Sequence, residues 1–287
     1  MRIPDYIKKH DFEYNSYEEI PELLFETIKE KLKDKQSENP LASIVAIAYN
    51  EEKNILKSLS SLADQVVDFP IEIIYVNNNS KDNTQKILDR VGVRNVFQIK
   101  QGAGHARQAG LDIAKGKFLI SADSDSIYPP YYTSELVKHL KNEEFKGVYG
   151  LFSFLPDGEK SRFQLAIYEF FKDIIIKLRS VNRPELTVGG ASFGFVTEIA
   201  KQDGWRTNIH RGEDGCMLAS MKRRGKVMLI TSRKSRVWTS SRTLDKDGNM
   251  LKMIMKRLIK ELKRINEYFT KQKKGYKTRE ENIIKED

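Results

Sequence analysis

The sequence predicts an α/β protein with a mostly parallel sheet flanked by helices. Short apolar runs rich in β-branched residues recur along the first half of the chain, and helical stretches separate them. Strands that are apolar on both faces are typical of buried parallel sheets, and parallel strands need long, usually helical, connections. A chain of 287 residues can bury a substantial core as one large domain with appendages.

Residues 1–40 are predicted to form a helical extension. The run from Ser16 to Glu19 fits a capping box, and apolar residues at helical spacing follow it to about Lys35. Pro21 prefers the first helical turn and would move the start of the helix a few residues later. We expect this helix to pack on the domain that follows it.

Residues 41–243 are predicted to form one α/β domain. Strands are expected at residues 43–49, 71–76, 95–99 and 117–122, with helices between them that end near Ala63, begin near Asp82 and cover 104–114. The alternation of strands and helices is less regular after Tyr131. Strands are expected there at 148–154, 227–230 and 236–239, and helices at 162–178 and 211–222.

Residues 244–287 are predicted to form a basic amphipathic helix and a charged tail. Its apolar stripe consists of Leu251, Ile254, Met255, Leu258, Leu262, Ile265 and Phe269. Because lysines and arginines lie beside this stripe, the helix either contacts an anionic membrane or packs its apolar side on the core.

The composition is that of a soluble globular protein with an anionic partner. The net charge is +10, and 31% of the residues are charged. This excess suits nucleic acid, nucleotide phosphates or an acidic membrane face, without choosing among them. The single cysteine, Cys216, excludes an intramolecular disulfide, and no run is long and apolar enough for a signal core or a membrane span. We expect a cytoplasmic protein, with the inner membrane face as an alternative location.

Three predicted strand ends carry polar side chains. They are Tyr49-Asn50-Glu51, Asn77-Asn78-Asn79-Ser80 and Asp123-Ser124-Asp125. In a parallel sheet these ends share one edge, where open α/β sheets bind ligands. Tyr49 can stack on a base, and the Asn78 amide can hydrogen-bond a base edge or a ribose. The sequence therefore predicts a nucleotide-sized crevice at this edge.

The pair Asp123 and Asp125 predicts a divalent-metal site. Two carboxylates at short range repel each other unless a cation neutralises them, and hard oxygen ligands suit Mg²⁺ or Mn²⁺. Other ligand motifs are absent or incomplete. The run from Gly102 to Arg107 fails as a dinucleotide fingerprint because Arg107 replaces the last glycine, and neither a P-loop nor a zinc spacing occurs.

This ordered set resembles the family-2 glycosyltransferases. The resemblance rests on residues 48–52, 77–84 and 104–110, on Asp123-Ser124-Asp125 with Pro129-Pro130, and on Gly212-Glu213-Asp214. It covers about residues 42–242 and implies a GT-A fold, a nucleotide-diphosphate sugar donor, and inversion at the sugar.

The resemblance also implies roles for the matching residues. Tyr49 and Glu51 would form the nucleotide pocket together with Asn50, Asp123 would lie by the ribose or donor sugar, and Asp125 would bind Mn²⁺ or Mg²⁺. Asp214, preceded by Glu213, would be the general base. From the residues themselves, Arg107 is a candidate cation for the diphosphate, and the glycine-rich run around Gly190 would let the backbone approach a ligand.

One departure from the family concerns the nucleotide base. The family often carries Asp in the second strand-end motif, where this chain has Asn77 and Asn78. An amide both donates and accepts hydrogen bonds, so the uridine assignment is weakened and other bases stay open. The late run Trp238 to Arg242 resembles the family's serine–arginine stretch and is a second candidate contact for the diphosphate.

The sequence therefore predicts metal-dependent glycosyl transfer to an acceptor hydroxyl, in cell-surface polysaccharide or glycolipid synthesis. The acceptor would be a sugar or a lipid-linked glycan. One alternative is a polyprenyl-phosphate sugar synthase on the same fold, whose ionised acceptor would need no base. A basic nucleic-acid-binding protein leaves the strand-end acids unexplained, and an inactive scaffold with this fold is a further alternative.

Overall fold

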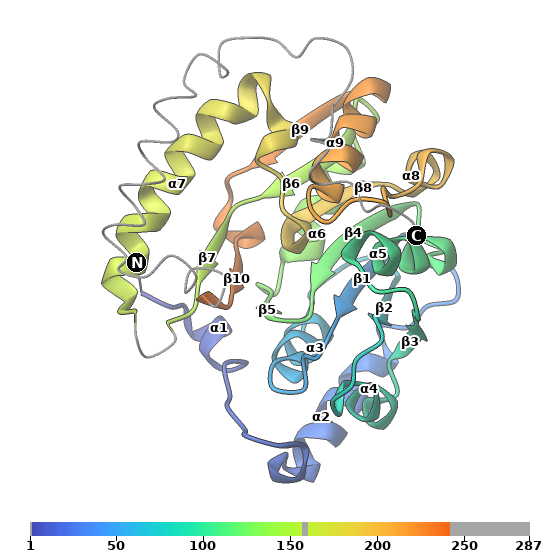
Figure 1. Ribbon diagram of the computed structural model, residues 1–287, viewed down its shortest axis with the longest axis vertical. Coiled ribbons are helices and arrows are strands. Elements are labelled where there is room, and N and C mark those ends of the chain that lie inside the picture. The colour runs from blue at the N-terminus through green and yellow to red at the C-terminus, as the bar shows by residue number, and fades with distance from the viewer. Residues whose placement is uncertain (1, 157–159, 242–287) are drawn as a thin grey trace.

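The computed structural model describes residues 2–156 and 160–241, and its centre is a seven-stranded sheet in the order β3-β2-β1-β4-β8-β6-β9 (Figure 1). The strands are β1 (Ala42–Ala48), β2 (Ile71–Asn77), β3 (Arg94–Phe97), β4 (Phe118–Asp123), β6 (Phe145–Gly150), β8 (Phe193–Val196) and β9 (Lys226–Ile230). The first four are parallel, β8 is antiparallel to both of its neighbours, and β9 is parallel to β6. The predicted α/β class with a mostly parallel sheet is confirmed.

Helices cover both faces of this sheet. One face packs against α2 (Glu22–Lys33), α3 (Ile55–Ala63), α4 (Thr84–Val91) and α6 (Tyr132–Leu140). The other packs against α5 (Ala103–Ile113), α8 (Thr197–Asp203) and α9 (Glu213–Arg224). Successive residues of β1 alternate between the two cores, with Ile44 in the first and Val45 in the second. The strands are therefore buried on both sides, which explains their apolar runs.

The N-terminal extension contains the expected packed helix but not the expected capping box. A short helix α1 (Asp5–Lys8) is followed by a single 3₁₀ turn, η1 (Tyr17–Glu19), and the Ser16 side chain forms no cap. Pro21 favours an extended conformation at Ile20 and so separates this turn from α2, which begins at Glu22. Helix α2 buries three apolar side chains in the core: Phe25, Ile28 and Leu32.

The single strand predicted at 148–154 is wrong, because the chain changes sheets at Leu151. Strand β6 ends at Gly150, and β7 (Phe152–Phe154) joins a second sheet in the order β5-β10-β7. The other members of that sheet are β5 (Ser126–Ile127) and β10 (Val237–Thr239). A Cβ atom on Gly150 would collide with the Ser192 hydroxyl and come within 2.9 Å of the Ser235 carbonyl oxygen, so this change of direction requires close backbone packing.

Helix α7 (Arg162–Asn182) runs along the outer side of the molecule, next to β7 (Figure 1). It is longer than the predicted 162–178, because the helical pattern continues to Asn182. In the part of the chain that the structure describes, no helix is long and apolar enough to cross a membrane. The predicted C-terminal helix within residues 244–287 and Arg242 lie outside the described residues.

Candidate functional site

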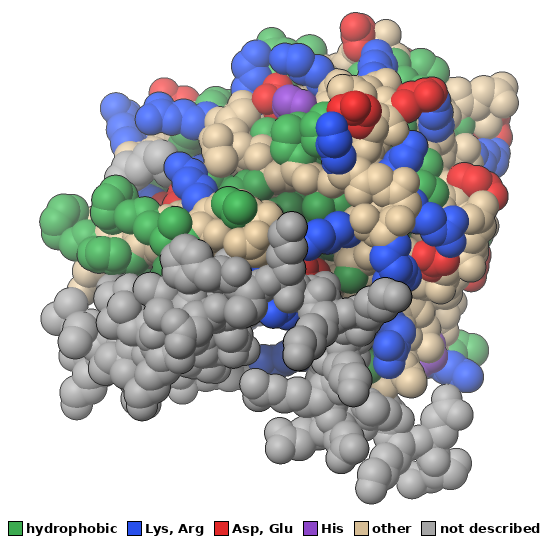
Figure 2. All heavy atoms as spheres, turned by 90° about the horizontal axis from the view of Figure 1, so that it is seen from above, with side chains coloured by type: hydrophobic (Ala, Val, Ile, Leu, Met, Phe, Trp, Pro, Cys, Tyr) green, Lys and Arg blue, Asp and Glu red, His purple; other side chains and the backbone are tan. Residues whose placement is uncertain are grey.

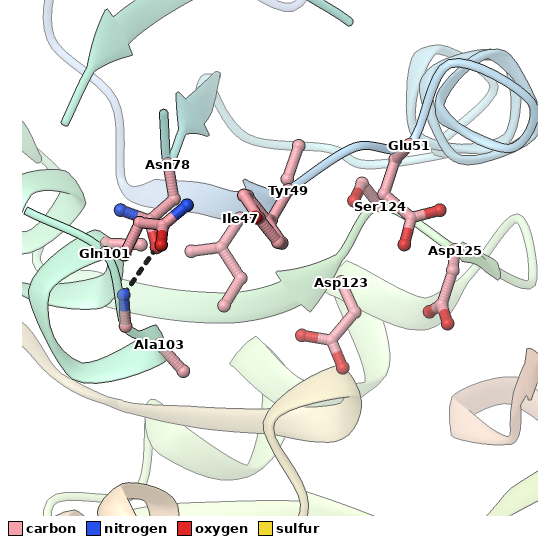
Figure 3. Close-up of a pocket in the computed structure, with 12 residues that line it drawn as sticks. Ile47, Tyr49, Glu51, Asn78, Gln101, Ala103, Asp123, Ser124 and Asp125 are labelled. Carbon is pink, nitrogen blue, oxygen red and sulfur yellow. Dashed lines mark hydrogen bonds between the residues drawn. The ribbon is translucent and has the colours of Figure 1, made fainter. Parts of the chain in front are cut away.

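A cavity of about 530 Å³ opens at the carboxyl ends of β2, β1 and β4 (Figure 3). It is lined by Ile47, Ala48, Tyr49, Glu51, Asn78, Gln101, Gly102, Ala103, Ala106, Asp123, Ser124 and Asp125. The three strand ends that the sequence singled out therefore contribute to one crevice, as expected for neighbouring parallel strands. The Tyr49 side chain is 49% exposed, which leaves its ring accessible to a ligand.

The end of the cavity opposite Asp125 is built around the Asn78 amide. Its Nδ2 donates to the carbonyl oxygens of Lys100, at 2.7 Å, and Gln98, at 3.3 Å. Its Oδ1 accepts from the Gly102 backbone N–H at 2.8 Å. Asn78 therefore holds the loop 98–102, and a contact with a base stays a prediction.

This loop also contributes cavity residues that the sequence reasoning missed. Gln101 lines the cavity two residues before α5, and Ala103 lines it as the first residue of that helix. Gly102 has a φ of 131°, which favours glycine and lets the loop turn into the helix. Gly102 is the sequence signal for this turn, although its spacing also matches part of a dinucleotide fingerprint.

Asn50 connects the loop after β1 to the loop after β2 by hydrogen bonds. Its φ is 53°, a left-handed conformation that Asn tolerates better than most residues. The Asn50 N–H donates to the Ser80 hydroxyl at 2.9 Å, and its Oδ1 accepts from the Lys81 N–H at 2.8 Å. Asn50 is not among the residues that line the cavity, and its predicted part in the nucleotide pocket stays a prediction.

Carboxylates collect at the other end of the cavity. Figure 3 shows Glu51, Asp123 and Asp125 at this end, away from Asn78 and Gln101. Burial raises the pKa of Asp123, Arg107 opposes that shift, and the Asp125 charge adds to it. The Asp125 carboxylate accepts hydrogen bonds from Ser126 Oγ at 3.1 Å and Thr239 Oγ1 at 3.4 Å.

Asp123 and Asp125 at this end are the residues that could hold a divalent cation. No Lys or Arg is among the described residues that line the cavity. Within residues 2–156 and 160–241, no group of three or more His, Cys, Asp and Glu residues is arranged so that it could hold a metal ion. Mg²⁺ typically takes one or two protein carboxylates and completes its shell with water and substrate phosphates. Asp123 and Asp125 match that number of carboxylates, and the metal site itself stays a prediction.

Arg107 connects the cavity to helix α9. Its Nη2 lies 3.0 Å from Asp123 Oδ1, its Nε lies 3.2 Å from Asp214 Oδ1 and 3.8 Å from Glu213 Oε1, and its Nη1 donates to Ser121 Oγ. Burial lowers the pKa of Arg107, but these three carboxylates outweigh burial and raise it. Arg107 is only 5% exposed and does not line the cavity, so its predicted contact with the diphosphate stays a prediction.

Gly190 makes room for this arrangement. A Cβ atom there would overlap the Arg107 guanidinium and lie 2.9 Å from Asp214 Oδ1. The structure therefore places Gly190 against Arg107 and Asp214, and it is not among the residues that line the cavity. Its predicted approach to a ligand stays a prediction.

The Asp214 side chain is partly buried, with 16% of its surface exposed, and its pKa is shifted. It follows Glu213 in the first turn of α9, after Gly212 with its φ of 93°. Burial raises the pKa of Asp214 to about 7, Arg107 opposes the shift, and Glu213 and Asp123 add to it. A carboxyl group with a pKa near neutrality can accept and release a proton at physiological pH.

Known proteins match this chain in sequence over part of its length. The putative glycosyltransferase EpsH of Bacillus subtilis is 32% identical over 111 residues, which are 37% of this chain and 32% of that protein. The UDP-Glc:alpha-D-GlcNAc-diphosphoundecaprenol beta-1,3-glucosyltransferase WfaP of Escherichia coli is 31% identical over 108 residues, 36% of this chain and 43% of that protein. The chain therefore spans less than half the length of these two relatives.

A solved structure and a family model complete the comparison. The mannosyltransferase PcManGT from Pyrobaculum calidifontis, in complex with GDP-Man and Mn²⁺, matches with a TM-score of 0.53 and 20% identity over 75% of this chain and 63% of that chain. This likeness shows the GT-A fold. The model for Glycosyl transferase family 2 matches residues 43–201, more than half of the chain. The predicted resemblance is confirmed, and the chain belongs to glycosyltransferase family 2, a family of glycosyl-transferring enzymes.

Proposed function

We propose that this protein transfers a sugar from a nucleotide-diphosphate sugar to an acceptor hydroxyl with inversion, in a reaction that depends on Mn²⁺ or Mg²⁺. The observation that carries the proposal is the cavity at three parallel strand ends, with Asp123 and Asp125 at one end and Asp214 joined to it through Arg107. Polysaccharide or glycolipid synthesis is supported by the relative WfaP, whose name specifies a sugar linked to a diphosphate lipid as acceptor.

The donor would lie along the cavity with its base near Tyr49 and its diphosphate near Asp125. The exposed Tyr49 ring offers a stacking surface, and the loop held by Asn78 closes the far end. A divalent cation held by Asp125 and Asp123 would stabilise the negative charge that develops on the departing diphosphate.

Asp214 would act as the general base. The acceptor oxygen forms a bond with the anomeric carbon and gives its proton to the Asp214 carboxylate, while the bond between that carbon and the diphosphate oxygen breaks. The nucleoside diphosphate leaves with the electron pair. Attack from the side opposite the leaving group inverts the anomeric centre. The Arg107 contact at 3.2 Å from Asp214 Oδ1 orients the carboxylate for this step.

Donor binding tests the proposed metal site. Calorimetry with UDP-, GDP-, dTDP- and CDP-sugars is expected to show Mn²⁺-dependent binding of one nucleotide class. Asp125→Ala should weaken that binding by at least about tenfold, because it removes a direct ligand of the cation. Glu143→Ala is the matched control, since Glu143 is an exposed carboxylate outside the cavity. If the folded protein bound no donor with metal present, or if Asp125→Ala bound as tightly as the parent, the proposal would be wrong.

Asn78→Asp tests how the cavity selects a base. The variant keeps the acceptor for the Gly102 N–H but sets a carboxylate oxygen against the carbonyl oxygens of Lys100 and Gln98, which now accept from the amide. We expect the loop 98–102 to shift and all donors to bind about tenfold more weakly, as is typical when one buried hydrogen-bond partner is removed.

The control is Asn79→Asp, because Asn79 neighbours Asn78 but contacts the Lys81 side chain instead of the loop. The same donor panel should bind this control as it binds the parent. Tighter binding of UDP-sugars alone by Asn78→Asp would instead show that residue 78 contacts the base.

A further inference from the structure

Residues 7–17, here called the strap, begin in α1, pass along α3 and end in η1 (Figure 1). They lie N-terminal to the region 43–201 that the family model matches. Two apolar side chains of the strap are buried, with Ile7 0% exposed and Tyr14 9% exposed. By contrast, Figure 2 shows hydrophobic side chains gathered at the edge of the molecule where α7 lies, and Phe163 of that helix is 74% exposed. The strap is therefore docked on the rest of the molecule and is not a loose tail.

The anchors of the strap lie outside the cavity. Ile7 packs in an apolar cluster with residues of β5 and β10. His10 Nδ1 lies 2.8 Å from the Ser60 hydroxyl, and the Asp11 carboxylate lies 3.0 Å from the Lys57 ammonium, so both residues contact α3. None of these five residues lines the cavity. The strap is therefore fixed in place before it reaches the loop that follows β1.

The C-terminal end of the strap contacts Glu52, which directly follows the cavity residue Glu51. The Tyr14 hydroxyl donates to the Glu52 carbonyl oxygen at 2.8 Å, and the Tyr17 backbone N–H donates to Glu52 Oε1 at 2.9 Å. The same Oε1 accepts from Asn83 Nδ2 at 3.0 Å. Glu51 lines the cavity, whereas Tyr14 and Tyr17 do not. The strap thus holds a cavity loop without reaching the cavity itself.

The loop after β2 holds the same loop through its amides. Three successive N–H groups donate to side chains there: Asn50 to Ser80 Oγ at 2.9 Å, Glu51 to Thr84 Oγ1 at 2.9 Å, and Glu52 to Asp82 Oδ2 at 3.0 Å. The strap adds the donors to the Glu52 carbonyl and carboxylate oxygens. Residues 50–52 are therefore held between two segments, of which the strap comes from outside the matched family region.

We propose that the strap positions Tyr49 and Glu51 for the donor, with Tyr14 as a positioning residue. This inference rests on the proposed function, because the sugar nucleotide is what Tyr49 and Glu51 would contact. A side chain in a binding site is held by the contacts of the residues around it, so a shift of Glu52 would move both neighbours. A loop that is already ordered also loses less conformational freedom when the ligand binds.

Hydrogen exchange in the absence of any ligand tests the hold on the loop. Tyr14→Phe keeps the ring and removes the hydroxyl that donates to Glu52. Amide exchange in a peptide covering residues 49–54 should become about fivefold faster, the factor expected when one hydrogen bond is lost. Tyr6→Phe is the matched control, because Tyr6 lies in the same extension but packs on the cluster around Trp238. It should leave the exchange of this peptide unchanged.

Calorimetry tests the consequence for the cavity. UDP-, GDP-, dTDP- and CDP-sugars are titrated with Mn²⁺ into the parent and both variants. Tyr14→Phe should weaken the binding of the nucleotide class that the parent binds by about fivefold, with unchanged stoichiometry. Tyr6→Phe should bind as the parent does. A purely structural role would instead lower the stoichiometry, because it would reduce the fraction of folded protein and not its affinity.

Three results would overturn the inference. They are unchanged loop exchange in Tyr14→Phe, an equal acceleration of exchange in β1, β2 and β4, and faster loop exchange with unchanged donor affinity. A parent that binds no sugar nucleotide would contradict the proposed function. The exchange measured without ligand would then still decide whether the strap holds the loop, so the two failures are distinguishable.

Discussion

Replacing Asp214 by Asn is expected to lower kcat by about 10²–10⁴-fold, the usual contribution of a general base. The amide of the variant cannot accept the acceptor proton, whereas the donor cavity does not include residue 214 and should still bind the donor. Steady-state kinetics on the purified variant, together with donor calorimetry, measures the two effects separately.

The same residue predicts the pH dependence of the parent enzyme. Burial raises the pKa of Asp214 to about 7. A base works only when ionised, so kcat/KM should fall as the pH decreases below about 7 and level off above it. Asp214→Asn should lose this acidic limb along with most of its activity. Asp112→Asn, which changes an exposed carboxylate on α5, should keep both.

Two other outcomes would have definite meanings. If Asp214→Asn remained nearly as active as the parent, the acceptor would already be ionised. That result would favour a lipid-phosphate acceptor and hence a polyprenyl-phosphate sugar synthase. If activity fell but the acidic limb persisted in the residual rate, another group would be the base and Asp214 would only position it.

Replacing Arg107 by Met is expected to lower the free energy of unfolding by about 3–5 kcal/mol at pH 8, the range found when one partner of a buried ion pair is removed. Arg107 is buried among the carboxylates of Asp123, Glu213 and Asp214, and methionine fills part of its volume without its charge. The variant would leave these acids next to one another without a cation.

The loss of stability caused by Arg107→Met should be larger at high pH than at low pH. The pKa of Asp214 in the folded protein is about 7, above its ordinary value of 3.8, so the folded state holds an extra proton between these values. The stability contributed by that proton is present at low pH and is lost as the pH rises through 7. Arg107 opposes the shift, so its removal raises the pKa of Asp214 further. Arg107→Met should therefore be less destabilising at pH 6 than at pH 8.

Urea unfolding at the two pH values measures this difference. The control is Arg90→Met, because the ion pair of Arg90 with Glu22 is at the surface and such pairs contribute about 0–1 kcal/mol. An equal loss for Arg107→Met at both pH values would show that packing volume, and not charge, accounts for the role of Arg107.

The sequence predicted that these strand ends meet in one cavity because their placement depends on local signals. Each polar cluster directly follows an apolar strand, and parallel strands that are neighbours must present their carboxyl ends together. Tyr49, Glu51 and Asp125 could therefore be placed before the structure was known. The second half of the domain was less predictable, since Gly150 ends one strand and the next residues join a different sheet.

The environments of Arg107 and Asn78 could not be predicted from sequence. Arg107 lies on a helix, and its burial depends on Gly190 and on α9, which are far away in the chain. The Asn78 amide could equally have contacted a ligand, and only the path of the loop 98–102 shows which carbonyl oxygens it holds. Contacts of this kind depend on tertiary packing and leave no periodic pattern.

The cluster around Arg107 limits which parts of the chain could be exchanged with those of another family member. The family model ends at residue 201, so it includes Arg107, Asp123 and Gly190 but not Glu213 and Asp214. The matched region of this chain thus contains the buried cation Arg107, whereas two of the carboxylates that balance its charge lie C-terminal to that region. A chimera that joins this region to another relative's C-terminal half would need an acid at the start of the equivalent helix. Without one, the exchange would leave Arg107 with fewer of the carboxylates that balance its charge.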